Sequence, residues 1–227
     1  MSNEIIKLTD VNKIYKTKAE EIHILKNVNL TFSEGDFVSI QGKSGSGKTT
    51  LLNILGLLDI PTSGKMYIDG KEINYRNENL KNAIRNEKIG FVFQFHYLLN
   101  EFTALENVMM PALINKKMNK REVRSKAEEL LEMVGLKDRT GHKPLELSGG
   151  EKQRVAIARS MVNSPEIILA DEPTGNLDTE TSLVINSLFK KINEEKKQSI
   201  IIVTHSLELA NLATFKYKIE KGEFNQV

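Results

Sequence analysis

The chain has 227 residues, of which 40% are hydrophobic, and no cysteine, so disulfide bonds and thiolate metal sites are excluded. A chain of this length buries roughly 70 to 75% of the surface that its unfolded form exposes, which is enough for one domain to fold without crosslinks. The 32 basic and 30 acidic residues are mixed along the sequence and leave a net charge of +2, which argues against nucleic acid as a partner.

No apolar run approaches the roughly 18 residues that cross a membrane. Polar and acidic residues interrupt the apolar pattern of residues 1–16, which is therefore not the pattern of a secretory signal. We expect a protein that stays where it is made and does not itself cross a membrane.

The predicted elements indicate an α/β protein. The opening segment alternates apolar and polar residues in the manner of a strand, most clearly over residues 22–32. A helix is expected directly after Lys48, and a short hairpin arm over residues 66–73. Short apolar runs typical of strands buried in a parallel sheet recur at 37–41, 89–93, 167–170 and 200–203.

Between the second and third of these runs the pattern becomes helical. Asn119 and Glu122 form a capping box, and an apolar stripe with helical spacing follows as far as Gly135. We expect a single domain over 1–227, with its core formed by 1–93 and 166–227 and a helical subdomain inserted at about 94–165.

Residues 42–49 read GKSGSGKT, which fits the P-loop pattern. Because a strand precedes this string and a helix follows it, backbone N–H groups and the helix N-terminus are expected to surround the phosphates of a nucleotide; the alternative is a chance glycine-rich turn. Lys48 is expected between the β and γ phosphates, and the Thr49 hydroxyl at a magnesium position. The pattern offers no account of Lys43, an additional cation inside the loop.

Two further candidates follow predicted strands. Asp171 ends the run 167–170, which places its carboxylate at the carboxyl edge of the sheet, beside the phosphate loop, where it is expected to hold magnesium. His205 follows the run 200–203 and is expected at the same edge, although a lone histidine carries little weight without that position.

A second string, LSGGEKQR, occupies residues 147–154. Ser148 can cap the helix that follows, and Gly149 and Gly150 let backbone N–H groups approach an anion, so this is a second candidate phosphate site. Together with the P-loop and the acidic pair at 171–172, the string resembles the signature of the ATP-binding-cassette (ABC) ATPases, which couple ATP binding and hydrolysis to movement of a partner.

This resemblance covers nearly the whole chain. It implies a P-loop NTPase core, with a mostly parallel sheet, flanking helices, an antiparallel β arm and an inserted helical signature subdomain. It also implies that Glu172 is the catalytic base, that His205 contacts the γ phosphate, and that Gln94 reaches magnesium or water. By the same resemblance Asp178 lies at a contact between subunits and Tyr15 stacks on adenine, although Tyr15 could equally belong to the core.

The expected site residues fall into three groups. The expected catalytic residues are Glu172, His205, Gln94 and Lys48. The expected nucleotide contacts are Tyr15, Gly42, Lys43, Ser44, Gly45, Ser46, Gly47, Lys48, Thr49, Thr50, Ser148, Gly149, Gly150 and Asp178. The expected magnesium ligands are Thr49, Gln94 and Asp171.

The resemblance implies two kinds of partner. One is a second copy of the chain, in a head-to-tail dimer where the signature of one copy closes on ATP held by the other. The second is a set of integral membrane permease subunits that dock near residues 94–102. Residues 91–102 hold five of the fourteen Phe and Tyr residues, too many apolar side chains to bury locally, although we expect Phe91 and Phe93 in the core.

Within the family, residues 94–108 (QFHYLLNEFTALENV) and 170–178 (ADEPTGNLD) most resemble the subfamily that releases lipoproteins in Gram-negative bacteria. Its members pass lipoproteins from the inner membrane to a periplasmic carrier, which implies a peripheral protein on the cytoplasmic face of that membrane. Macrolide or peptide exporters and a cell-division complex remain alternatives, because their nucleotide machinery is the same.

Two other classes are less consistent with the sequence. ABC ATPases that act on DNA carry long coiled coils and those that act on ribosomes carry two cassettes, and this chain has neither. A small-molecule kinase on a P-loop core would leave LSGGEKQR unexplained.

Overall fold

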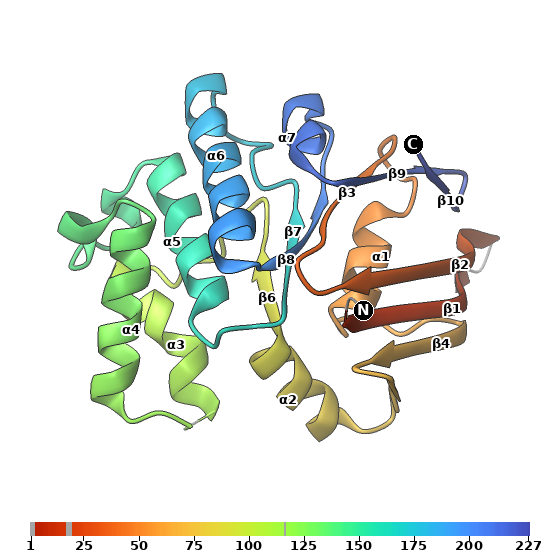
Figure 1. Ribbon diagram of the computed structural model, residues 1–227, viewed down its shortest axis with the longest axis horizontal. Coiled ribbons are helices and arrows are strands. Elements are labelled where there is room, and N and C mark those ends of the chain that lie inside the picture. The colour runs from red at the N-terminus through yellow and green to blue at the C-terminus, as the bar shows by residue number, and fades with distance from the viewer. Residues whose placement is uncertain (1–2, 17–19, 116) are drawn as a thin grey trace.

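The protein is described by a computed structural model that covers residues 3–16, 20–115 and 117–227. Its larger sheet has the strand order β10-β9-β3-β8-β7-β6 (Figure 1). The bounds of these strands are Phe37–Gln41 (β3), Ile89–Val92 (β6), Ile167–Asp171 (β7), Ser199–Val203 (β8), Phe215–Glu220 (β9) and Glu223–Gln226 (β10). Neighbouring strands are parallel except for β9 and β10, so the predicted buried runs do form a parallel sheet.

A second, antiparallel sheet has the order β2-β1-β4-β5. Its strands are Glu4–Lys16 (β1), Glu21–Ser33 (β2), Ser63–Ile68 (β4) and Lys71–Glu72 (β5). The turn between β4 and β5 has positive φ at Asp69 (49°) and Gly70 (70°), as a two-residue hairpin requires. The predicted hairpin is therefore the end of a larger antiparallel arm, and the predicted α/β fold class is confirmed.

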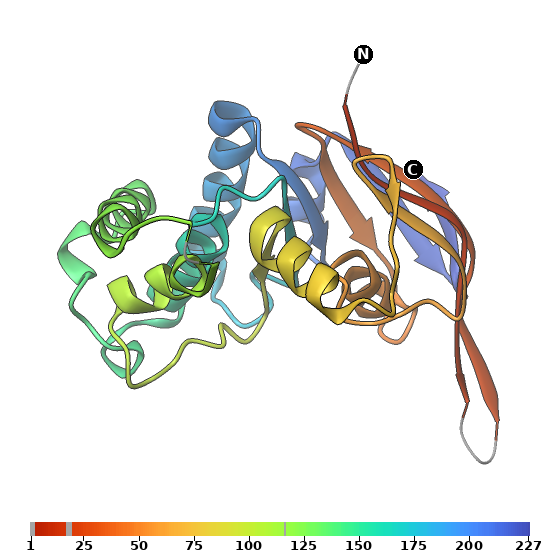
Figure 2. The same cartoon turned by 90° about the horizontal axis from the view of Figure 1, so that it is seen from below.

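The helices cover both faces of the parallel sheet. They are Lys48–Leu55 (α1), Glu78–Lys88 (α2), Ala104–Asn115 (α3), Lys120–Met133 (α4), Gly149–Met161 (α5), Thr179–Lys196 (α6) and Leu207–Leu212 (α7). Short 3-10 turns at Lys137–Arg139 and Pro144–Glu146 lie between α4 and α5. Helices α3, α4 and α5 gather beside the β6 edge, at the opposite end of the molecule from the antiparallel sheet (Figures 1 and 2). None of the described helices is long and apolar enough to span a bilayer.

Alternation along the strands divides the core into two clusters. In β7, Ile168 and Ala170 point to a cluster that also contains α6 and the helices α3 to α5. Ile167 and Leu169 point to the other cluster, which contains α1 and the antiparallel sheet. Both faces of the parallel sheet are therefore buried, which explains why its strands read as continuous apolar runs.

Helix α4 forms as the sequence predicts. The Asn119 side chain accepts from the backbone N–H of Glu122 at 3.0 Å, and the Glu122 carboxylate accepts from the Asn119 N–H at 2.9 Å. The helix ends before Gly135, whose φ is 73°. Its predicted stripe packs into the core, with Leu130 half-buried and Val123, Ala127, Leu131 and Val134 buried.

Replacing Leu131 by Ala should lower the free energy of unfolding by about 2–5 kcal/mol, because its fully buried side chain would leave a cavity. Leu183→Ala, at a leucine that is 50% exposed on α6, is the matched control and should cost less than about 1 kcal/mol. Urea unfolding of both variants measures the difference. Equal losses would contradict the assigned packing of α4.

Candidate active site

The carboxyl ends of β3, β7 and β8 converge on one cavity of about 520 Å³. The phosphate loop joins β3 to α1, Asp171 ends β7, and His205 follows β8. The lining residues are Ile24, Ser44, Gly45, Gly47, Lys48, Thr49, Thr50, Gln94, Asp171, Glu172, Gly175 and His205. The structure thus brings together the residues predicted from four separate strings of the sequence.

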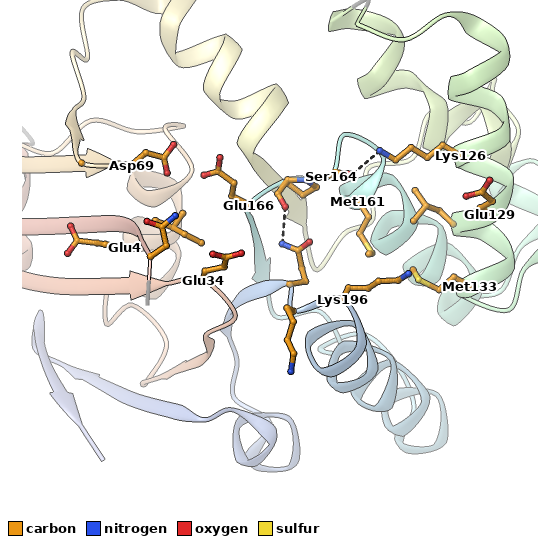
Figure 3. Close-up of a pocket in the computed structure, with 17 residues that line it drawn as sticks. Glu4, Glu34, Asp69, Lys126, Glu129, Met133, Met161, Ser164, Glu166 and Lys196 are labelled. Carbon is orange, nitrogen blue, oxygen red and sulfur yellow. Dashed lines mark hydrogen bonds between the residues drawn. The ribbon is translucent and has the colours of Figure 1, made fainter. Parts of the chain in front are cut away.

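A larger cavity of about 1050 Å³ lies at the amino ends of β7 and β8, between α4 and the antiparallel sheet (Figure 3). Two of its carboxylates, Asp69 and Glu166, are paired with Lys88, and Lys126 donates to Ser164 at 2.8 Å. None of the predicted site residues lines it. The smaller cavity is therefore the candidate site.

The phosphate loop is built to receive an anion. A Cβ at Gly42 would lie 2.6 Å from the Ser46 Oγ and from Ile219, so only glycine fits there. Gly47, with φ 104°, precedes α1, and no side chain caps this helix or places a carboxylate in its first turn. The first N–H groups of α1 and its positive dipole end are therefore left for a ligand.

Lys48 is buried at the centre of this loop and is 6% exposed. Its Nζ donates to the carbonyls of Gly42 at 2.8 Å and Lys43 at 3.1 Å, and lies 3.2 Å from the His205 Nε2. Burial lowers the pKa of Lys48, and the carboxylates of Glu172 and Asp171 oppose that effect. The ammonium thus has oxygen and nitrogen acceptors, and a phosphate would provide the close anion that it lacks.

Asp171 and Glu172 differ in the contacts that stabilise them. Asp171 accepts from the Thr49 hydroxyl at 3.5 Å, and its pKa is raised, mainly because burial disfavours its charge and Glu172 lies nearby. Glu172 has a left-handed backbone with φ 44°, a conformation that costs about 1–3 kcal/mol for a non-glycine residue. Its N–H still pairs with the Val203 carbonyl at 2.9 Å, so the β7–β8 pairing stabilises the strained residue.

One oxygen of Glu172 is fixed and the other is free. Oε2 accepts from the backbone N–H of His205 at 3.0 Å, whereas Oε1 is buried, has no hydrogen-bond donor and lies 3.3 Å from the His205 Nε2. Lys48 carries only donors, so its contact requires that the His205 Nε2 accept a hydrogen bond. That nitrogen then has no proton to give to Glu172, and Oε1 keeps an unused acceptor.

Gln94 reaches the cavity from the end of β6. Its Nε2 donates to the Asn176 Oδ1 at 3.1 Å, which connects it to the segment that follows Glu172. Ile24 and Gly175 also line the cavity and were not predicted. No local signal identifies Ile24, because it is one apolar residue of an alternating strand.

The signature residues lie apart from this cavity. The Ser148 hydroxyl accepts from the Glu151 N–H at 3.2 Å and caps α5, as predicted. A Cβ at Gly150 would lie 2.3 Å from the Thr181 Cγ2, so the start of α5 packs closely on the start of α6. Asp178 caps α6 by accepting from the Thr181 N–H at 2.8 Å. Within one chain, Ser148, Gly149 and Gly150 therefore lie outside the lining of the phosphate-loop cavity.

The remaining predicted contacts lie around the rim of the site. Tyr15 is 41% exposed, so the core alternative is wrong for this residue, and its hydroxyl donates to Asp59 at 2.8 Å. The Lys43 side chain is exposed, and its charge helps the hydrogen bond from Lys218 to lower the pKa of Glu220. The Ser46 Oγ is buried without a hydrogen-bond partner.

The aromatic segment after Gln94 is exposed to solvent, and α5 holds its backbone. Phe95 is 63% exposed and Tyr97 66%, and Leu99 and Phe102 are also exposed. Arg159 of α5 donates to the carbonyls of His96 at 2.8 Å and Tyr97 at 2.7 Å, so the signature helix supports this surface directly.

The expected core positions of Phe91 and Phe93 are met only in part. Phe91 is half-buried and packs against the core cluster that contains α1, whereas Phe93 is half-buried and belongs to neither core cluster. The Phe91 and Phe93 rings are stacked with their centroids 5.5 Å apart, and the Phe93 and Tyr97 rings are nearly perpendicular with their centroids 5.4 Å apart. These ring contacts connect β6 to the exposed aromatic segment.

Comparison with known proteins gives consistent results. The model of the ABC transporter family matches residues 25–175. The lipoprotein-releasing system ATP-binding protein LolD of Saccharophagus degradans is 50% identical over 226 residues, which cover 100% of this chain and 99% of LolD. LolD of Aquifex aeolicus is 49% identical, with 97% of this chain and 96% of LolD covered.

Two solved structures of the bacterial ABC transporter cassette MJ0796 are similar throughout. One, described as dimeric, is 46% identical with a TM-score of 0.89 and 98% of both chains covered. The other, described as a dimeric post-hydrolysis state bound to ADP and Pi, is 45% identical with the same TM-score and coverage. With the family's model matched over residues 25–175 and relatives about half identical along nearly the whole chain, this chain belongs to the ABC transporter family.

Proposed function

We propose that this chain is the ATP-hydrolysing subunit of a transporter that releases outer-membrane-directed lipoproteins from the inner membrane to a periplasmic carrier. The observation that carries the proposal is the cavity in which the phosphate loop, two strand-end carboxylates and His205 meet. The names of the LolD relatives support the cargo. The chain would act as a peripheral protein on the cytoplasmic face of the inner membrane.

In this proposal the residues of the cavity share the chemistry. Lys48 and the N–H groups of α1 bind the β and γ phosphates. The Glu172 carboxylate, which lines the cavity and keeps an unused acceptor, accepts a hydrogen bond from the attacking water and turns it toward the γ phosphate. His205 contacts the same phosphate, because its Nε2 lies beside both Lys48 and Glu172. Tyr15 would stack on the adenine.

We also propose Mg²⁺ as the cofactor of ATP. Thr49, Asp171 and Gln94 present hydroxyl, carboxylate and amide oxygens to one cavity, which are hard ligands suited to this ion. Among the described residues, no group of three or more His, Cys, Asp or Glu side chains could hold a metal alone, so phosphate oxygens and water would complete the coordination. The bound ion would neutralise charge on the phosphates.

The site would be completed by a second copy of the chain. Gly149 and Gly150 of the signature do not line the cavity of their own phosphate loop, and the dimeric MJ0796 cassettes are similar over 98% of this chain. In a head-to-tail dimer, these N–H groups would reach the γ phosphate held by the partner subunit.

The permease would dock on the exposed residues at 94–102. An aromatic and aliphatic surface supported by an arginine is typical of a docking site for a partner. We retain the division into a nucleotide-binding core (1–93 and 166–227) and a helical subdomain (about 94–165), which the grouping of α3, α4 and α5 beside β6 supports.

The function itself is tested by purifying the chain with its native permeases, reconstituting the complex in lipid vesicles and measuring ATP-dependent transfer of an acylated lipoprotein to a soluble carrier. We expect transfer with the acylated protein and none with the same protein lacking its acyl chains. ATP hydrolysis that responds to a drug or peptide instead would contradict the proposed cargo.

Replacing Glu172 by Gln should slow ATP hydrolysis about 10²–10⁴-fold while ATP binding persists, because the amide no longer polarises water. With ATP, the variant should also accumulate as a dimer in light scattering. Glu194→Gln, at an exposed residue late in α6, is the control and should hydrolyse ATP normally. Hydrolysis within a few-fold of the wild type, or a persistent monomer with bound ATP, would contradict these roles.

Asp171→Asn should raise the melting temperature of the nucleotide-free protein at neutral pH, because it removes a carboxylate whose pKa burial raises. A raised pKa in the folded state means that the wild type loses stability as pH rises through that pKa. The higher melting temperature of the variant should therefore vanish at the lowest pH at which both proteins stay folded.

Asp171→Asn should also lose the additional thermal stabilisation that Mg²⁺ gives with ATP. If the variant keeps that stabilisation, Asp171 is excluded as a magnesium ligand.

Leu99→Ala should weaken the association with the permease about 5–10-fold, because it truncates an apolar contact of the docking surface. The matched control is Leu80→Ala on α2, since the two leucines are 44% and 40% exposed. Affinity for the permease in detergent micelles measures both. Equal effects of the two variants would place the docking surface elsewhere.

A further inference from the structure

Lys13 and Asp59, which belong to none of the sequence motifs, both contact the Tyr15 side chain. The Asp59 carboxylate accepts from the Lys13 Nζ at 2.6 Å through Oδ1 and from the Tyr15 hydroxyl at 2.8 Å through Oδ2. The same Oδ1 accepts from the Ile60 N–H at 2.7 Å, and Lys13 donates to the Ile60 carbonyl at 2.7 Å. Asp59 is thus fixed on its own loop and fixes both other side chains.

Lys13 also covers one face of the ring. Positions 13 and 15 are two apart on β1, so both side chains point to the same side of the strand, toward the loop after α1. The Lys13 Nζ lies 4.8 Å from the ring centroid, and its side chain is only 11% exposed. A cation buried to this degree needs the carboxylate, the carbonyl and the aromatic face to replace its water.

The Tyr15 side chain lies next to a residue of the nucleotide cavity. Thr50 lines that cavity, and its side chain opposes the rise in the Tyr15 pKa that burial and Asp59 cause, so the two side chains lie close together. Tyr15 remains 41% exposed although Lys13 occupies one face of its ring. Burial acts to raise the pKa of Asp59, but the hydrogen bonds from Lys13 and Tyr15 hold it below the usual value, so the Asp59 carboxylate stays charged at neutral pH.

We propose that Lys13 and Asp59 are positioning residues that hold the Tyr15 ring as a preformed platform for the purine base of the nucleotide. The inference rests on the proposed contact of Tyr15 with adenine. A ring free to rotate would lose side-chain freedom on each binding event, and prior fixation removes that cost, which corresponds to about a 2–10-fold change in affinity. The effect depends on the base, because Lys13 and Asp59 are absent from the lining of the phosphate cavity.

The test compares ATP with inorganic tripolyphosphate, which has the phosphates but no base. Isothermal titration of the full-length chain gives the dissociation constant of each ligand for the wild type, Lys13→Met and Asp59→Asn. We expect the dissociation constant of ATP to rise about 2–10-fold in both variants while that of tripolyphosphate stays unchanged. Lys7→Met, on an exposed lysine of the same strand, is the control and should change neither.

Equal losses for both ligands, or no loss of ATP affinity in either variant, would overturn the proposal. Two variants are used because Asp59→Asn could also loosen its loop, whereas Lys13→Met keeps the length of the buried stem. Because Asp59 is proposed to act through Tyr15, adding Asp59→Asn to Tyr15→Ala should weaken ATP binding no further than Tyr15→Ala alone. Additive losses would show that Asp59 acts by another route.

Tyr15→Ala separates this inference from the function on which it rests. If that variant leaves the ratio of ATP to tripolyphosphate affinity unchanged, the proposed contact of Tyr15 with adenine fails and the positioning role fails with it. If Tyr15→Ala reduces the ratio but Lys13→Met and Asp59→Asn do not, only the positioning role is wrong.

Discussion

The burial of the Lys48 ammonium against carbonyls of its own loop is the constraint on which the rest of the site depends. Lys48 is 6% exposed, and the oxygen acceptors of its ammonium are neutral backbone groups. Such a charge is tolerated where acceptors surround it and an anion can approach. The uncapped N-terminus of α1 presents N–H groups to the same space, and Asp171 and Glu172 supply negative charge from the end of β7.

The parallel sheet makes this concentration of charge possible. Its strands are buried on both faces and end together, so side chains that follow β3, β7 and β8 must meet. The cost appears as a raised pKa at Asp171 and a left-handed backbone at Glu172. Both are stable because the surrounding sheet fixes them, and both leave groups poised for a ligand.

Hydrogen bonds connect the site to the surfaces around it. Arg159 joins α5, the helix that carries the signature, to the exposed aromatic segment through the carbonyls of His96 and Tyr97. On the opposite flank, Asp59 joins the loop after α1 to β1 through Lys13 and Tyr15. These contacts connect the places where nucleotide, second subunit and permease are proposed to bind.

The sequence by itself determined the elements and residues whose chemistry is local. The phosphate loop, the capping boxes before α4 and α5, and the strand-end positions of Asp171 and His205 depend on near neighbours, and each was predictable. Helices α2, α6 and α7 and the strands β9 and β10 were not predicted although they carry local signals, since Asn77, Asp178 and Ser206 cap the helices and a turn at Lys221 and Gly222 joins the strands. The half-burial of Phe91 and Phe93 was not predictable, because packing partners distant in the chain decide it. Only the tertiary structure sets Lys48 beside His205, Arg159 beneath Tyr97 and Asp59 between Lys13 and Tyr15, since these contacts join segments that meet only when the sheet has assembled.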